Sequence, residues 1–207
     1  MSSYVFMKVL ESAAHRYDLG MRMLSLGRID DIYSGVADLV ATDGARVLDI
    51  GCGTGDNSIW LAQKNFQVTG IDASETAVQK AREKALQAKI KCTFMVMDFL
   101  TGKITGAPFG FAFDRGCFHS FHSDEERQKF AENVAAHLEN GGLWLSLVGN
   151  ADDQRPGPGP PRRTARDIVN AVEPSFEILS LVAGHFGSNR PDPPGCWVCL
   201  MRKRGFV

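Results

Sequence analysis

The chain has 207 residues, with 23 Lys and Arg against 24 Asp and Glu, so its formal net charge is −1. This balance argues against the broad basic surface that binding to nucleic acids or membrane surfaces requires. The sequence also lacks both an export signal and the run of ~20 apolar residues that spans a bilayer. We therefore expect a cytoplasmic protein with reduced cysteines, one domain over residues 1–207, and small-molecule ligands rather than nucleic acid or membrane partners.

Hydrophobic spacing predicts an N-terminal helical cap over residues 1–43 and an alternation of strands and helices over 44–207. Strands are expected at 46–50, 67–71, 92–97, 109–113, 143–148, 176–183 and 197–202, and helices at 56–64, 74–88, 124–139 and after Thr164. Capping boxes at Ser123-x-x-Glu126 and Thr164-x-x-Asp167 start the last two helices. The order predicts a Rossmann-like α/β fold, with a seven-stranded, mostly parallel sheet, helices on both faces and the N-terminal helical cap.

The first strand runs into a glycine-rich turn, with glycines at 51, 53 and 55, and then into a helix that begins near Asp56. Glycines allow positive φ and bring a ligand close to backbone amides. The dinucleotide fingerprint G-x-G-x-x-G would need a glycine where Asp56 stands. A carboxylate there would repel a pyrophosphate but would tolerate a cationic ligand without phosphate, such as S-adenosylmethionine.

The run from Asp49 to Gly55, Asp-Ile-Gly-Cys-Gly-Thr-Gly, resembles the glycine-rich motif of the class I S-adenosylmethionine-dependent methyltransferases. Asp72 ends the next strand about 20 residues on, where such folds place the acid that binds the ribose hydroxyls. Asp98 and Phe99 resemble the adenine site, with a carboxylate for the amine and a ring for stacking. The resemblance implies cofactor contacts from Asp49, Gly51, Cys52, Gly53, Gly55, Asp72, Ala73, Asp98, Phe99, Asp114 and Arg115.

Each of these residues also has a structural interpretation. The glycines could serve close packing alone. Asp72 could cap the following helix, although Ser74 is the better cap by type and position. Asp98 and Phe99 could form an ordinary turn with a core aromatic ring.

In an open parallel sheet, ligands bind outside the carboxyl ends of the strands, so the loops after the fourth, fifth and sixth strands are expected to line the acceptor site. The expected contacts are Cys117, Phe118, Arg162, Arg163, His185 and Arg190. Their arginines favour an anionic or electron-rich acceptor, although arginines on such loops are commonly solvated. The proline-rich stretch at 149–161 is interpreted as a lid over the cleft, or alternatively as a surface connection.

Methyl transfer from a sulfonium donor depends mainly on positioning, and an acidic acceptor would also need a general base. The candidate bases are His119, His122 and Tyr17; the alternative is that they only shape the pocket. No metal site is expected, because Cys196 and Cys199 are three apart on a strand and point to opposite faces.

The sequence thus predicts an enzyme that transfers a methyl group from S-adenosylmethionine to a small molecule and releases S-adenosylhomocysteine. It also resembles the thiopurine and tellurite-resistance types within that family. The motif Asn/Asp-Pro-Pro-Tyr/Phe of base-amine methyltransferases is missing after Asp114. The alternatives are an NAD-type oxidoreductase, which Asp56 disfavours, and a non-catalytic module that binds S-adenosylmethionine. The acceptor atom and the oligomeric state do not follow from the sequence.

Overall fold

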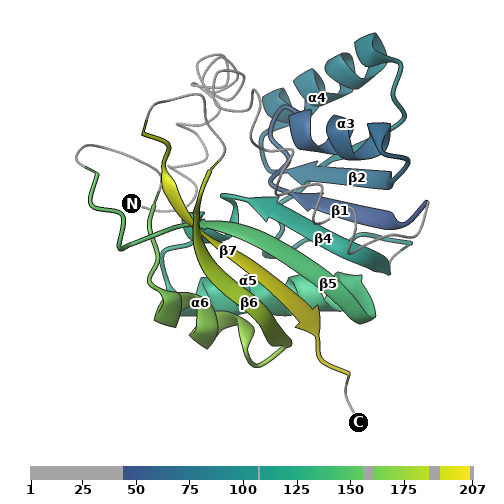
Figure 1. Cartoon of the computed structure of the whole chain (residues 1–207). Helices are drawn as coiled ribbons and strands as arrows, with labels where there is room; N and C mark the ends of the chain where they lie inside the picture. Colours follow the sequence, from purple (N-terminus) through teal and green to yellow (C-terminus); the bar gives the residue numbers. More distant parts are fainter. Residues whose placement is uncertain (1–43, 107, 156–160, 187–191, 206–207) are drawn as a thin grey trace.

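The structure, a computed structural model, describes residues 44–106, 108–155, 161–186 and 192–205 (Figure 1). The predicted cap over 1–43 lies outside these residues, as do Tyr17 and Arg190. The described elements are β1 (Arg46–Ile50), α3 (Asp56–Gln63), β2 (Gln67–Asp72), α4 (Glu75–Ala88), β3 (Thr93–Val96), β4 (Phe109–Arg115), the short 3-10 helix η1 (Phe118–Ser120), α5 (Asp124–His137), β5 (Leu138–Gly149), α6 (Ala165–Val172), β6 (Phe176–His185) and β7 (Gly195–Lys203).

These strands form one seven-stranded sheet in the order β3-β2-β1-β4-β5-β7-β6. The first five strands in this order are mutually parallel, and β7 is antiparallel to both of its neighbours. The chain therefore reverses its winding between β3 and β4, and β1 and β4 lie side by side at the centre of the sheet (Figure 1). This arrangement confirms the predicted Rossmann-like, mostly parallel sheet.

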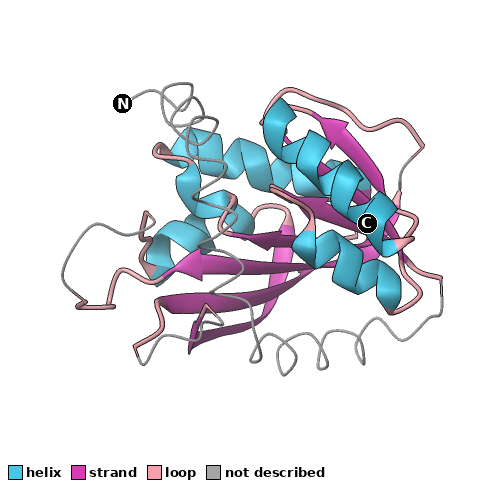
Figure 2. Ribbon diagram, turned by 90° about the horizontal axis from the view of Figure 1, so that it is seen from above, coloured by secondary structure: helices cyan, strands magenta, loops and turns pink. Residues whose placement is uncertain are grey.

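The sheet is covered on both faces, as its sequence predicts (Figure 2). Alternate residues of one strand face opposite layers, and in β1 both Val47 and Leu48 are fully buried. Val47 packs in the cluster that includes Leu61 of α3. Leu48 belongs to the opposite cluster, which contains Phe130 of α5 and Ile168 of α6. In the described residues, no helix is both long and apolar enough to span a membrane.

Both predicted capping boxes are present. The hydroxyl oxygen of Ser123 accepts from the amide of Glu126, and the Glu126 carboxylate accepts in return from the Ser123 amide. The same exchange links Thr164 and Asp167. These caps fix where α5 and α6 begin at the carboxyl edge of the sheet, so the loop between β4 and α5 has a defined end.

The largest error in the predicted boundaries lies between α5 and β5. The helix expected to run to Glu139 ends at His137, and β5 begins at Leu138 rather than Leu143. Leu138 pairs with Phe109 of β4, and a register shift follows before the next pair. The irregularity accommodates Gly141 at φ 73°, so the Asn-Gly-Gly run lies within an irregular strand instead of a separate turn.

Candidate cofactor and acceptor site

Four carboxylates lie in or just beyond the last residues of four neighbouring strands. They are Asp98 after β3, Asp72 in β2, Asp49 in β1 and Asp114 in β4. Because these strands are parallel, their carboxyl ends meet at the same edge of the sheet, where the chain reverses its winding. Ligands of doubly wound sheets bind at such an edge.

The backbone amides of the glycine loop are bonded within the protein. The amides of Gly51, Cys52, Gly53 and Gly55 donate, in this order, to Ile71 O, Ile71 O, Asp72 Oδ2 and Cys52 O at 2.8, 2.9, 2.9 and 2.9 Å. The expectation that these amides face a ligand is therefore wrong. A pyrophosphate would find none of them free, which disfavours a dinucleotide ligand on stronger grounds than the sequence offered.

Two of the glycines are required by packing. Gly51 has φ 70°, and a Cβ built on it would lie 2.8 Å from the Cβ of Cys117. Gly55 has φ 82°, and its Cβ would lie 2.8 Å from Ala81 and 3.0 Å from the ring of Phe94. The close-packing interpretation is thus confirmed at both positions. The proximity of Gly51 and Cys117 also places Cys117, which was predicted to contact the acceptor molecule, directly against the glycine loop.

The Asp56 carboxylate, which was expected to repel a pyrophosphate, is not an isolated charge. Asp56 accepts from the ammonium of Lys84 at 3.1 Å, and this ammonium donates to the hydroxyl of Thr54 at 2.7 Å. The carboxylate is therefore paired with a cation from α4 instead of standing alone at the start of α3. The ion pair ties the glycine loop and α3 to α4.

Asp72 is held in a fixed orientation at the end of β2. Its Oδ2 accepts from the amide of Gly53 and its Oδ1 from the amide of Ser74, both at 2.9 Å. Ser74 caps α4 through its own hydroxyl, which accepts from Ala77. Burial raises the pKa of Asp72, and the bonds from Ser74 and Gly53 oppose this rise. Each oxygen keeps a lone pair for a further donor, so the carboxylate is suited to a diol.

Asp49 is almost completely buried in β1. Its Oδ2 accepts from the Ser58 hydroxyl of α3 at 2.5 Å. Burial raises the pKa of Asp49 to about 7; the bond from Ser58 opposes this rise, and the charges of Asp72 and Asp114 add to it. Asp49 is thus a carboxyl group that changes charge near neutral pH.

Asp114 is fully buried, and its bonds are all internal to the protein. Its Oδ1 accepts from the amides of Cys117 and Phe118 at 3.1 and 3.0 Å, and its Oδ2 accepts from the indole of Trp144 at 3.1 Å. Burial raises its pKa to about 6. These contacts do not leave a surface for a ligand, so the expected cofactor contact of Asp114 is corrected: it organises the loop after β4.

The neighbours Asp98 and Phe99 differ in accessibility: Asp98 is exposed and Phe99 is buried. Asp98 is exposed, and its Oδ1 accepts from the amide of Leu100 at 2.9 Å. The Phe99 ring is buried against Phe130 and His137, with ring centroids 5.1 and 5.5 Å away. The predicted stacking role of this ring is wrong, because the ring belongs to the core under α5. Ala73, which follows Asp72, is exposed.

His119 is a buried, neutral imidazole. Its Nδ1 accepts from the amide of Gly149 at 2.8 Å, so the proton lies on Nε2. Burial, followed by the charge of Arg163, lowers its pKa to about 3. Its ring also packs edge-on against Phe186. These contacts link the loop after β4 to the end of β5, and they correct the expectation of a general base at His119.

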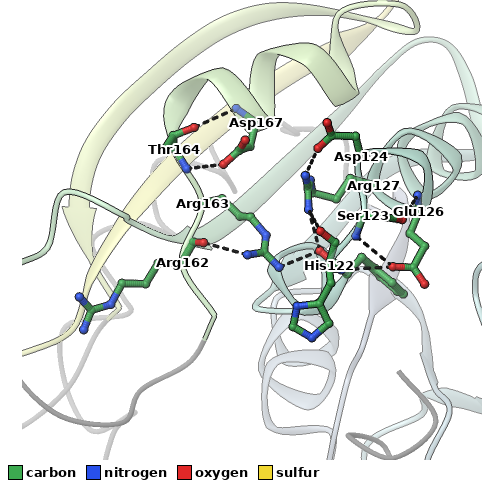
Figure 3. Close-up of polar contacts among 10 residues, drawn as sticks. His122, Ser123, Asp124, Glu126, Arg127, Arg162, Arg163, Thr164 and Asp167 are labelled. Carbon is green, nitrogen blue, oxygen red and sulfur yellow. Dashed lines mark hydrogen bonds and ion pairs between the residues drawn. The ribbon is translucent and has the colours of Figure 1, made fainter. Parts of the chain in front are cut away.

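His122 differs from His119 because its side chain is exposed. Its backbone is held on both sides: its amide donates to Glu126 at 3.2 Å and its carbonyl accepts from Arg127 at 2.8 Å. The imidazole points away from the guanidinium groups of Arg127 and Arg163 (Figure 3). His122 is therefore a fixed residue with an accessible ring.

The arginines expected at the acceptor site bind backbone carbonyls. Arg163 donates to Phe121 O at 2.7 Å, and burial lowers its pKa (Figure 3). Arg162 donates to the carbonyls of Asp153 and Arg155. These two guanidinium groups therefore do not form the electropositive entrance that the sequence predicted.

A third arginine near the proline-rich loop, Arg155, is paired with a carboxylate. Arg155 forms an ion pair with Asp153, and bonding from Arg155 lowers the pKa of Asp153. Asp153 Oδ2, which takes part in this ion pair, also accepts from the amide of Gly195 at 2.8 Å. The proline-rich loop is therefore anchored at residues 153–155. Its central part, 156–160, lies outside the described residues, so the lid remains a sequence prediction.

Two other predicted acceptor contacts differ in accessibility. The ring of Phe118 is fully buried between Phe130 and Trp144, which corrects its predicted role. His185 is exposed at the end of β6, paired in register with Gly195.

Sequence reasoning missed three residues that set up this site: Ser58, Lys84 and Trp144. Each bonds to an acid or a loop residue between 9 and 30 positions away. Neither their type nor their spacing carries a recognisable motif. Trp144 is a partial exception, because a buried indole needs an acceptor and the neighbouring strand ends in an acid.

Comparison with known proteins agrees with the geometry. Residues 47–142 match the family model described as a methyltransferase domain. The chain is 31% identical to the cypemycin N-terminal methyltransferase of a Streptomyces species over 71% of its length, and it spans 59% of that protein. It is 26% identical to the probable thiol methyltransferase 2 of Arabidopsis thaliana, covering 80% of this chain and 74% of the relative.

The fold of a solved structure is also similar. Magnesium protoporphyrin IX methyltransferase of Synechocystis PCC 6803, with S-adenosylmethionine bound, matches with a TM-score of 0.72 at 21% identity, over 98% of this chain and 97% of that one. The segment that matches the family model, residues 47–142, runs from β1 to the start of β5. This part of the chain carries the glycine loop and the four strand-end acids. Residues 47–142 therefore match a methyltransferase domain, and the chain shares its fold with S-adenosylmethionine-dependent methyltransferases.

Proposed function

We propose that this protein transfers a methyl group from S-adenosylmethionine to a small-molecule acceptor. The observation that carries the proposal is the row of strand-end carboxylates beside a glycine loop in which the amides of Gly51, Cys52, Gly53 and Gly55 are already bonded. Such an edge suits a ligand with hydroxyl, amine and cationic groups and offers little to a phosphate. When bound, S-adenosylmethionine supplies a methyl group on a positively charged sulfur, which is a good leaving group.

The protein's own residues would orient this ligand. Asp72 would accept from the ribose hydroxyls with the lone pairs that its two amide donors leave. Asp98, which is exposed beyond β3, would accept from the adenine amine. Cys117 lies against Gly51 and would form the wall between the loop and the acceptor. Burial raises the pKa of the Cys117 thiol well above its usual value, so this side chain stays neutral.

The acceptor is proposed to be an electron-rich small molecule, such as a thiol, rather than a strong anion. Arg162 and Arg163 bind backbone carbonyls, and Arg155 is paired with Asp153, so these cations give an anionic acceptor little support. The name of the Arabidopsis relative, a probable thiol methyltransferase, points the same way. The near-neutral net charge of −1 supports the expectation that nucleic acids are not substrates.

The direct test is titration calorimetry with S-adenosylmethionine and S-adenosylhomocysteine, followed by a coupled homocysteine assay over a panel of thiols, amines and phenols. Asp72→Ala is expected to weaken the binding of both ligands by about 1.5–3 kcal/mol, because hydrogen bonds to a charged group are lost. Asp72→Asn keeps one acceptor oxygen and therefore only one of the two amide bonds, so thermal unfolding of both variants is needed to separate loss of the ligand contact from loss of the loop. Glu177→Ala on β6 serves as the control. A protein that binds NADH and ignores both ligands contradicts the proposal.

Of the candidate bases, we propose His122 for acidic acceptors, because its ring is exposed whereas that of His119 is buried. His122→Ala should lower kcat by about 10²-fold with a phenol and much less with a thiol. His119→Ala should instead lower the melting temperature, because it leaves the Gly149 amide without its acceptor. Steady-state kinetics with both acceptors, together with thermal unfolding, decides this. Equal kcat losses for both acceptors in His122→Ala would exclude a base.

A further inference from the structure

The strand-end acids Asp49, Asp72 and Asp114 differ in how well their charge is compensated. Asp72 accepts from two backbone amides, and Asp114 accepts from two amides and an indole. Asp49 has one donor residue within the described part of the chain, the neutral Ser58, although its side chain is as deeply buried as that of Asp114. A buried carboxylate with so little compensation is costly to ionise, and a cation placed beside it lowers that cost.

The groups around Asp49 do not supply that cation. In the described residues, the charged groups that shift its pKa are Asp72 from β2 and Asp114 from β4, both of which are carboxylates. The other titratable groups that interact with it are the thiols Cys52 of the glycine loop, Cys92 before β3 and Cys117 before η1. Burial raises the pKa of each thiol, so all three are neutral at pH 7.

We propose that Asp49 is the specificity-determining residue that lets the site distinguish its cationic cofactor from the product by charge. The inference rests on the proposed function. S-adenosylmethionine and S-adenosylhomocysteine share the adenosine, amino and carboxylate groups and differ by one methyl group and one positive charge. An ionised Asp49 without a counter-ion among the described residues favours the ligand with the extra charge. The same charge contributes nothing to holding the neutral thioether of the product.

The preference of the site for the cationic ligand should increase with pH. Since the pKa of Asp49 lies at about 7, the carboxyl group is largely protonated in acid and ionised above neutrality. A cationic ligand favours the ionised form, so its binding releases a proton near neutral pH. The neutral thioether has no such preference. The α-amino group of both ligands also titrates, at about pH 8, and the sulfonium charge lowers its pKa in the cofactor relative to the product. Asp49→Asn keeps this ligand effect and is therefore the reference for it.

The experiment is calorimetric binding of both ligands to the full chain at four pH values between 5.5 and 8.5, with buffers of different ionisation enthalpy to count protons. The ratio of the two Kd values, product over cofactor, is expected to rise about tenfold from acid to alkaline pH, which corresponds to a pKa change of one unit on binding. In Asp49→Asn the ratio should be lower at alkaline pH, and it should change less with pH than in the wild type, because Asp72 and Asp114 still titrate. Ser58→Ala, which removes the donor to the ionised form, should move the midpoint to higher pH.

The outcomes separate this inference from the proposed function. If neither ligand binds at any pH, the proposed function fails. If both bind with a ratio that does not change with pH, or if Asp49→Asn keeps the wild-type slope, the charge discrimination by Asp49 is overturned while the proposed function stands. Should Asp49→Asn not fold, the midpoint shift in Ser58→Ala decides the inference, and an unshifted midpoint overturns it.

Discussion

Replacing Gly51 with alanine is expected to destabilise the protein by about 2–4 kcal/mol and to abolish cofactor binding. The left-handed backbone at φ 70° penalises any Cβ, and this Cβ would lie 2.8 Å from the Cβ and 3.0 Å from the Sγ of Cys117. Cys117 cannot retreat freely, because its amide donates to Asp114. Relief of the clash therefore has to displace the glycine loop from the carboxyl edge of the sheet.

Denaturant unfolding and calorimetric binding measure the two effects. Gly141→Ala is a matched control, because Gly141 has φ 73° but no atom within 4 Å of its Cβ position, so it reports the backbone cost alone. The double variant Gly51→Ala with Cys117→Gly removes the clash and should recover the difference between the two alanine variants. Equal losses in Gly51→Ala and Gly141→Ala would show that the contact with Cys117 carries no energy.

The sequence predicted the order of elements well where the signals are local. β1 was predicted with its observed bounds, and the capping boxes at Ser123 and Thr164 fixed two helix starts, because both ends of each box lie within four residues. The start of β5 was wrong, since it depends on pairing between Leu138 and Phe109, which are far apart in the chain. Local propensity does not contain that pairing.

The same reasoning applies to the site. The position of each acid at a strand end follows from the alternation of strands and helices. Whether an acid can reach a ligand depends on side chains that are distant in the sequence. The indole of Trp144 donates to Asp114, and Lys84 forms an ion pair with Asp56. His119 shows the limit most clearly: its type suggested a base, and its contact with Gly149 makes it a neutral structural residue.

The variant Asp49→Asn is expected to be more stable than the wild-type protein without ligand, by an amount that grows with pH. The pKa of Asp49 rises from 3.8 to about 7 on folding, because the native environment buries the carboxyl group. The native state therefore binds this proton more tightly than the unfolded state. Its contribution to stability is present below pH 4 and is lost progressively up to about pH 7.

Asparagine at this position stays neutral and can still accept from Ser58, so it resembles the protonated acid at every pH. The difference in unfolding free energy between variant and wild type should grow by roughly 2 kcal/mol from pH 5 to pH 8, as measured by urea unfolding.

His119 has the opposite effect, because its pKa falls to about 3 and the native protein loses stability as the pH drops below 6.5. In the wild-type protein the contributions of Asp49 and His119 to the pH dependence of the unfolding free energy therefore partly cancel. The difference between Asp49→Asn and wild type isolates the contribution of Asp49. His119→Gln should give a pH slope of the other sign, with its largest deficit at neutral pH. A constant difference between Asp49→Asn and wild type would mean that Asp49 is already ionised at pH 5, and the charge discrimination would lose its basis.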